Sequence, residues 1–216
     1  VGGYSAQVGG ESANAYNYRK MCEALDTEIG RLMEVVDPAQ THIIIIGDNG
    51  TPVQAVQAPF GAGRAKGSIY NGGTNVPMVV AGPAVTVAAG STTDTLVHCV
   101  DLFSTILEMA GVDESSVAGL AAMNVQSTSI LPILSGTDTE ERTMIAEVGG
   151  AAGSTHARAI ITDDYPNYKL IIFGDPDVAT DTPYFEFYDI GSDWNEQSRL
   201  GYAPNQPYEI STCLLY

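Results

Sequence analysis

The pattern of apolar and polar positions is clearest at Ile43–Ile46, where four β-branched residues follow one another without a polar side chain. A strand with one face in solvent alternates apolar and polar residues, and this run does not alternate. It therefore predicts a strand that is buried on both faces, as in a parallel α/β sheet.

Two amphipathic helices are also predicted. The first carries one apolar stripe made of Met21, Leu25, Ile29, Leu32 and Val36, spaced by three or four residues. Ser12 or Asn14 is suited to cap its start, and Asp37-Pro38 to end it. The second helix has a face formed by Leu96, Val100, Phe103, Leu107 and Ala110. It is expected to end at Gly111, a favourable residue just past a helix.

The pattern changes after residue 136. Short β-rich runs separated by Gly, Pro and Asp cover Thr143–Val148, Arg158–Thr162, Lys169–Phe173 and Tyr184–Ile190. These runs predict an antiparallel meander. A polar segment, Ser135–Glu141, is the expected boundary, which divides the chain into residues 1–136 and 137–216.

Polar chemistry follows the isoleucine strand directly, at Asp48 and Asn49. Open α/β sheets bind their ligands at the carboxyl ends of strands. The carboxylate and carboxamide oxygens are the donors that Ca²⁺ and Mg²⁺ prefer. An Asp-Asn-Gly sequence also forms ordinary tight turns, so this motif by itself leaves both interpretations open.

Charge and length exclude some classes of function. Asp and Glu outnumber Lys and Arg by 26 to 9, which gives a net charge of −17. Such a surface repels nucleic acid and anionic membranes. No apolar run approaches the ~20 residues of a membrane helix. An anionic substrate would depend on a local cation and on Lys66.

The cysteines and histidines do not form a recognisable site. Cys22 and Cys99 lie in apolar helical patterns and are expected to be buried free thiols, whereas Cys213 lies in a tail. His42, His98 and His156 are predicted to be structural or surface residues. No Gly-x-Ser-x-Gly elbow accompanies them.

The segment Arg64–Pro77, and above all Lys66-Gly67 with Gly72-Gly73-Thr74-Asn75-Val76-Pro77, gives the sequence its first family resemblance. Together with Asp48-Asn49-Gly50 before it, the segment resembles the late catalytic region of sulfatases in the alkaline-phosphatase superfamily. Further stretches follow the family order: Tyr18–Val36, Val100–Val112, Ser129–Gly136, and then Tyr168–Ile171 followed by Phe187–Ile190.

The resemblance implies a partial alkaline-phosphatase-like α/β fold, with a mixed sheet, flanking helices and a small C-terminal antiparallel sheet. Residues 1–136 would be the C-terminal part of the catalytic domain, and residues 137–216 a small α+β subdomain. Asp48 and Asn49 would bind Ca²⁺ or Mg²⁺. Lys66 would contact the sulfate ester, and Asp48 and Lys66 would be the catalytic residues. Asp101 would cap its helix.

The sequence departs from the family at several positions. Asn71 stands where the family has Glu, Asn75 where it has Arg, and Ser104 where it has Pro. None of the eleven prolines has Cys or Ser two residues before it, so the motif that yields the formylglycine nucleophile is absent from this sequence. The resemblance therefore implies a C-terminal sulfatase part whose formylglycine lies in a separate N-terminal half.

Two classes of function remain open from the sequence. One is the metal- and sulfate-binding part of a sulfuric ester hydrolase, acting on a small sulfate ester or a sulfated glycan. The other is a non-catalytic sulfatase-like structural or interaction module. Phosphoryl or phosphonate ester hydrolysis is a related alternative, because sulfate and phosphate have similar shapes. The expected protein partner is a complementary N-terminal segment or a second copy of the chain, and the compartment suggested by the resemblance is periplasmic or secreted.

Overall fold

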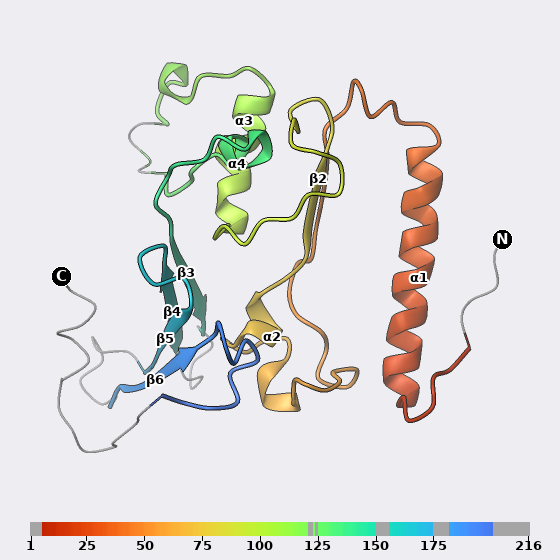
Figure 1. The fold of residues 1–216 in the computed structure, drawn as a ribbon, viewed down its shortest axis with the longest axis vertical. Helices are drawn as coiled ribbons and strands as arrows, with labels where there is room; N and C mark the ends of the chain where they lie inside the picture. Colours follow the sequence, from red (N-terminus) through yellow and green to blue (C-terminus); the bar gives the residue numbers. More distant parts are fainter. Residues whose placement is uncertain (1–5, 121–122, 124, 150–155, 175–181, 201–216) are drawn as a thin grey trace.

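The computed structural model describes residues 6–120, 123, 125–149, 156–174 and 182–200 (Figure 1). The helices among them are α1 Ala13–Met33, η1 Ala62–Arg64, α2 Asn71–Thr74, η2 Cys99–Asp101, α3 Leu102–Met109, η3 Glu114–Ser116 and α4 Leu131–Ser135. The strands are β1 Ile43–Ile46, β2 Met78–Ala81, β3 Thr143–Val148, β4 Ala157–Thr162, β5 Tyr168–Phe173 and β6 Tyr184–Asp189.

The C-terminal antiparallel meander is confirmed. β3, β4, β5 and β6 pair in chain order, every pair antiparallel. Alternate residues of β5 and β6 point to the same buried face, including Ile171 and Tyr188, neither of which is exposed. Ile69, from the segment before α2, packs against these buried residues. The sheet therefore forms a core with the loop that precedes α2.

The isoleucine strand is present as β1, but its predicted environment was wrong. β1 pairs antiparallel with β2, with Ile43 opposite Ala81 and Ile46 opposite Met78. Ile45 is 39% exposed, so the strand is not buried on both faces. Within the described ranges no further strand pairs with β1 or β2, and all strand pairs are antiparallel. The predicted mixed sheet is thus not seen there.

Helix α1 begins where the sequence predicted, because the Ser12 hydroxyl accepts a hydrogen bond from the Ala15 amide at 3.1 Å. Its apolar stripe, however, is not covered. Met21 is 68% exposed and Leu25 is 62% exposed, and α1 stands at the edge of the molecule (Figure 1). No helix among the described residues combines the length and apolar character needed to cross a membrane.

The expectation of buried thiols was wrong for both described cysteines, since Cys22 and Cys99 are exposed. Cys22 lies on α1, whose apolar residues are themselves largely uncovered, and Cys99 opens the short helix η2. Cys213 lies outside the described residues.

The second predicted helix is shorter than expected. Leu96 lies in irregular chain, and η2 and α3 together cover only Cys99–Met109. The end of the helix is confirmed, because Gly111 adopts a positive φ of 71° directly after the Ala110 cap. His98 explains the late start, since its Nδ1 accepts from the Val100 amide and caps η2.

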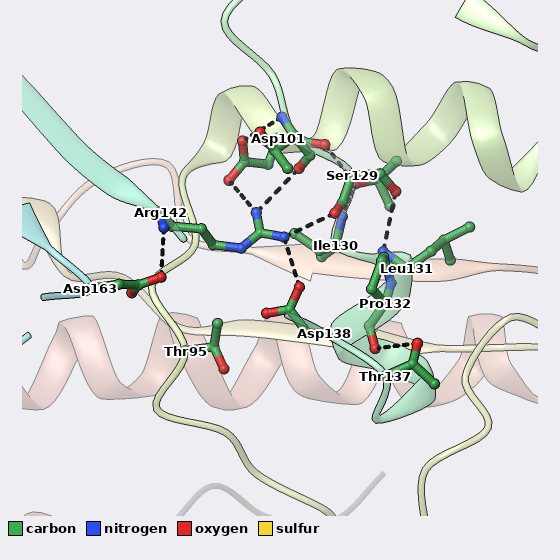
Figure 2. Close-up of polar contacts among 12 residues, drawn as sticks. Thr95, Asp101, Ser129, Ile130, Leu131, Pro132, Thr137, Asp138, Arg142 and Asp163 are labelled. Carbon is green, nitrogen blue, oxygen red and sulfur yellow. Dashed lines mark hydrogen bonds and ion pairs between the residues drawn. The ribbon is translucent and has the colours of Figure 1, made fainter. Parts of the chain in front are cut away.

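Asp101 is structural, but it does not cap α3 with its side chain as expected. Its carboxylate accepts hydrogen bonds from the amides of His98 at 2.9 Å and Thr128 at 3.0 Å. Figure 2 shows Arg142 beside it, with Nη1 3.7 Å from Asp101 Oδ2. Asp101 therefore joins the start of α3 to the segment after it and to Arg142.

Arg142 connects the chain on both sides of the predicted boundary (Figure 2). Its guanidinium donates to the Ser129 carbonyl at 3.1 Å and pairs with Asp138 at 3.3 Å. Its backbone amide donates to Asp163 at 2.6 Å, next to the end of β4. Arg142 thus gives the two predicted parts of the chain a buried polar connection, while the division into domains remains a prediction.

Candidate functional site

The Asp-Asn-Gly turn is held against the Gly-Gly turn by backbone hydrogen bonds. The Gly50 amide donates to the Gly73 carbonyl at 3.0 Å, and the Gly47 amide donates to the Pro77 carbonyl at 3.0 Å. A Cβ on Gly50 would lie 1.9 Å from the Gly72 carbonyl oxygen. Only glycine fits at position 50, and this close approach brings the two motifs together.

The loop that carries Lys66 is attached to the same turn. The Lys66 amide donates to the Thr51 carbonyl at 2.9 Å. Ala65 beside it is fully buried, and Gly67 after it has a positive φ of 85°. This anchored backbone places Lys66 next to the Asp48–Thr51 segment.

The candidate side chains themselves are accessible. Asp48 and Lys66 are exposed and Asn49 is half-buried. Within the part of the chain that the structure describes, none of the three makes a side-chain hydrogen bond or ion pair. They are therefore available to a ligand.

The donor set fits part of a hard-cation site. A carboxylate and an amide oxygen suit Ca²⁺ or Mg²⁺, but Ca²⁺ takes ~6–8 oxygen ligands. No group of three or more His, Cys, Asp or Glu side chains able to hold a metal occurs among the described residues. The remaining ligands would have to be water or groups from outside this set.

Sequence reasoning missed a buried ion pair behind the Lys66 loop. Lys169 Nζ lies 2.6 Å from Glu196 Oε1, and both side chains are almost completely buried. The same ammonium donates to the Ile69 carbonyl at 3.0 Å and to Asn71 Oδ1 at 2.9 Å. Burial lowers the pKa of the Lys169 ammonium, and the Glu196 carboxylate opposes that shift.

Two features of the sequence pointed toward this pair: Lys169 lies in an apolar run, and Asn71 stands where the family has Glu. A lysine in a strand is expected to face solvent, and nothing local indicates that its partner is Glu196. Asn71 was recognised only as a departure from the family pattern. In the fold its side-chain nitrogen, Nδ2, donates to the Trp194 carbonyl at 2.8 Å.

A second buried carboxylate, Glu186, lies on the neighbouring strand. It accepts hydrogen bonds from the hydroxyls of Tyr70 and Tyr188, each at 2.7 Å, and pairs with Arg199. Arg64 stacks on the Tyr70 ring, with its Cζ 4.1 Å from the ring centre. Burial, with the hydrogen bond to Glu186, raises the pKa of Tyr70 well above its ordinary value. Tyr70 is thus a neutral donor.

The histidines remain outside the candidate site. The His98 imidazole is used in capping η2, which supports a structural role. His156 is exposed, and its carbonyl accepts from the Gly174 amide. His42 is half-buried, with Nδ1 lacking a hydrogen-bond partner in the described structure. A catalytic role was not predicted for any of them.

The chain is similar to a known family and to a characterised relative. The model of the Sulfatase family matches residues 4–112, which include Asp48, Asn49 and Lys66. Arylsulfatase K of Xenopus laevis is 23% identical over 209 residues, covering 89% of this chain and 35% of that relative. The chain spans about a third of the length of the curated relative it matches.

Proposed function

The chain belongs to the sulfatase family, and on that premise we propose that it supplies the metal- and sulfate-binding part of a sulfuric ester hydrolase. The observation that supports this most is the joining of three separate motifs by backbone hydrogen bonds. The Gly50 amide bonds to Gly73 and the Lys66 amide bonds to Thr51. Three side chains without partners among the described residues thus lie on adjoining segments.

Asp48 and Asn49 are the proposed metal ligands. The carboxylate supplies charge and the amide a neutral oxygen, a combination suited to Ca²⁺ or Mg²⁺. A divalent ion held there supplies positive charge to a sulfate oxygen and favours the ionised form of a nucleophile. Asp48 would thus contribute to catalysis by holding the ion.

Lys66 is the proposed sulfate contact. Its ammonium is a compact charge that can donate to the oxygen linking sulfur to the leaving group. Negative charge develops on that oxygen as the ester breaks, so an ammonium that contacts it stabilises the transition state more than the ground state. With a net charge of −17, the chain needs such a local cation to hold an anionic substrate.

The nucleophile of this reaction would come from outside the present sequence. Members of the resembled family use a formylglycine made from Cys or Ser in a Cys/Ser-x-Pro-x-Arg motif, and the motif does not occur here. We assign the formylglycine to a separate N-terminal segment. The chain by itself is then expected to be inactive.

The proposed substrate is a sulfate ester. The relative from Xenopus laevis is named an arylsulfatase, which supports an aryl sulfate as the first compound to test. Small sulfate esters and sulfated glycans both present the group that Lys66 and the ion would bind. Phosphate and phosphonate esters present a similar tetrahedral group, and they form the matched alternative substrates.

A non-catalytic sulfatase-like module is the second candidate. The replacement of the family Glu and Arg by Asn71 and Asn75 favours it, together with the missing nucleophile motif. The reading frame upstream of Val1 separates the two candidates. A Cys/Ser-x-Pro-x-Arg motif in that frame supports the enzyme, and its absence supports the module.

The enzyme is tested by assaying the product of the whole reading frame on an aryl sulfate and on the matching aryl phosphate. Lys66→Ala is expected to lower kcat/KM for the sulfate ~100-fold or more, the usual effect of removing one oxyanion-stabilising donor. Lys20→Ala is the matched control, because Lys20 lies on α1 and pairs with Glu23. Equal activity of the Lys66 variant and the control would contradict the proposal.

A further inference from the structure

The buried pair Lys169–Glu196 is costly for a protein to maintain. The side chains are 2% and 0% exposed, and their charges have lost most of their contact with water. Such pairs often stabilise a fold no more than apolar residues of the same size would. A contribution to stability alone is therefore a poor explanation for its presence on the sheet.

Every hydrogen-bonding position of the ammonium is used. Lys169 carries three N–H donors, and they go to Glu196 Oε1, the Ile69 carbonyl and Asn71 Oδ1. The second carboxylate oxygen of Glu196 accepts a hydrogen bond from the backbone amide of Asn71 at 2.7 Å. The pair is thus bonded to the backbone on both sides of Tyr70.

Glu196 has an unusual backbone at this point. It is the non-glycine residue with positive φ in the described structure, at 57°, a conformation that is unfavourable for residues with a Cβ. Its side chain is also completely buried. The surrounding contacts hold this carboxylate toward Asn71 despite the strain.

The bonded segment leads directly to the candidate site. Ile69 and Asn71 follow Lys66 in the same loop, and Asn71 begins α2. Gly73 of α2 accepts the hydrogen bond from Gly50, next to Asn49. Asn71 is therefore linked to Lys66 along the same loop, and to the turn that carries the proposed metal ligands through the Gly50–Gly73 hydrogen bond.

We propose that Lys169 and Glu196 are positioning residues, through which the C-terminal sheet holds the Lys66 loop and the Asp48–Asn49 turn in one arrangement. The consequence for catalysis rests on the proposed function, whereas the positioning itself rests on the contacts. Neither residue touches substrate in this account. The C-terminal sheet is thus part of the machinery of the site, beyond being a neighbouring subdomain.

The test is amide hydrogen exchange, resolved by NMR, in the double variant Lys169→Met/Glu196→Gln. This change removes both charges together, so no charge is left buried and unpaired. The amides of Gly50, Lys66 and Asn71 should exchange about tenfold faster or more, while those of β3 and α1 are unchanged. The control Arg158→Met/Glu147→Gln removes an exposed ion pair from the same sheet and should leave all these rates unchanged.

Two results would overturn the inference. One is unchanged exchange at Gly50, Lys66 and Asn71. The other is an equal rise in all parts of the chain, which is the mark of a merely structural pair. If the double variant does not fold, Asn71→Ala decides the question. It keeps the ion pair but removes the bonds of the amide side chain, and it should accelerate the same amides.

Calcium titration of the same samples tests the proposed metal role independently of the positioning role of Lys169 and Glu196. The proposed function predicts Ca²⁺-dependent shifts at Asp48 and Asn49 in the unsubstituted chain, weakened several-fold in the double variant but not in the control. If those shifts are absent from the unsubstituted chain, the metal role fails. The exchange rates still decide whether Lys169 and Glu196 position the loop.

Discussion

Charged residues around the candidate site fall into two groups with different surroundings. Asp48 and Lys66 are exposed and have no partner among the described residues, whereas Lys169, Glu186 and Glu196 are buried and fully engaged. A group that must bind a ligand has to give up only water, while a buried group would have to break its existing bonds. We therefore assign ligand binding to the exposed residues, and positioning of the loop to the buried ones.

The buried phenol of Tyr70 makes the stability of the fold depend on pH. Burial, then the hydrogen bond and charge of Glu186, raise the pKa of its phenol above the ordinary value of 10.0. The protonated phenol therefore favours the fold, and its contribution is fully present below pH 10 and lost as pH rises beyond it. The free energy of unfolding, measured in urea from pH 8 to pH 11, should fall more steeply with pH for the unsubstituted chain than for Tyr70→Phe.

Tyr168→Phe is the matched control for this series, because Tyr168 is 38% exposed and stacks on Phe187, a contact that phenylalanine retains. Its pH profile should follow that of the unsubstituted chain. Identical profiles for the Tyr70 variant and the unsubstituted chain would show that the buried phenol is not linked to stability.

At the scale of elements, two turns are joined through glycine. The Asp-Asn-Gly turn after β1 and the start of α2 approach so closely that Gly50 meets the Gly72 carbonyl. Because the candidate metal ligands and the Lys66 loop both adjoin this contact, the spacing of the site depends on it.

Gly50→Ala should therefore destabilise the chain by ~1–3 kcal/mol, the usual cost of forcing extra atoms into a packed site. Gly61→Ala is the control, because nothing lies within 4 Å of a Cβ built there and its φ of −99° suits alanine. The control should stay within ~0.5 kcal/mol in urea unfolding. A Gly50 variant as stable as the control would mean that the two turns are not held together as described.

Local patterns predicted the elements whose contacts are local. The four C-terminal strands are short β-rich runs bounded by turn residues, and each pairs with its neighbour in the chain, so their bounds were predicted within a residue or so. The Ser12 cap and the Gly111 end were confirmed for the same reason. The antiparallel partner of β1 was missed, because an apolar run carries no information on strand direction.

The candidate site was predictable only in part. Asp48, Asn49 and Lys66 were chosen because of their motifs, and their assignment remains a prediction. Lys169 and Glu196 escaped notice because they bond to Ile69 and Asn71, which are far away in sequence. Such contacts depend on how the sheet packs against the loop, and periodicity does not report that.

At the scale of the whole molecule, the notable feature is apolar surface left uncovered by the described residues. Besides Met21 and Leu25 on α1, Val79 on β2 is 58% exposed, and the outer edges of β1 and β2 have no strand partner in the described ranges. Exposed apolar patches and open edges are typical association sites. They support the proposal that a complementary N-terminal segment or a second copy of the chain covers them.

The isolated chain should accordingly be found with such a segment or should self-associate. Light scattering across a concentration series should give a mass above the 22.7 kDa of one chain. Leu25→Glu/Val79→Glu, which charges two exposed apolar positions, should restore the monomer, whereas Glu28→Gln on α1 should not. A stable monomer of the unsubstituted chain at high concentration, with no copurifying peptide, would contradict this proposal.

The most direct test of the central claim is a calcium titration of the purified chain followed by NMR. We expect shifts centred on Asp48 and Asn49, with weak affinity because two protein ligands leave most of the ~6–8 oxygen positions to water. Asp48→Ala should abolish them, whereas Asp26→Ala, which removes an exposed carboxylate from α1, should leave them intact. Tight calcium binding that survives Asp48→Ala, or shifts confined to another part of the chain, would contradict the assignment of this turn as the metal-binding part of a sulfatase site.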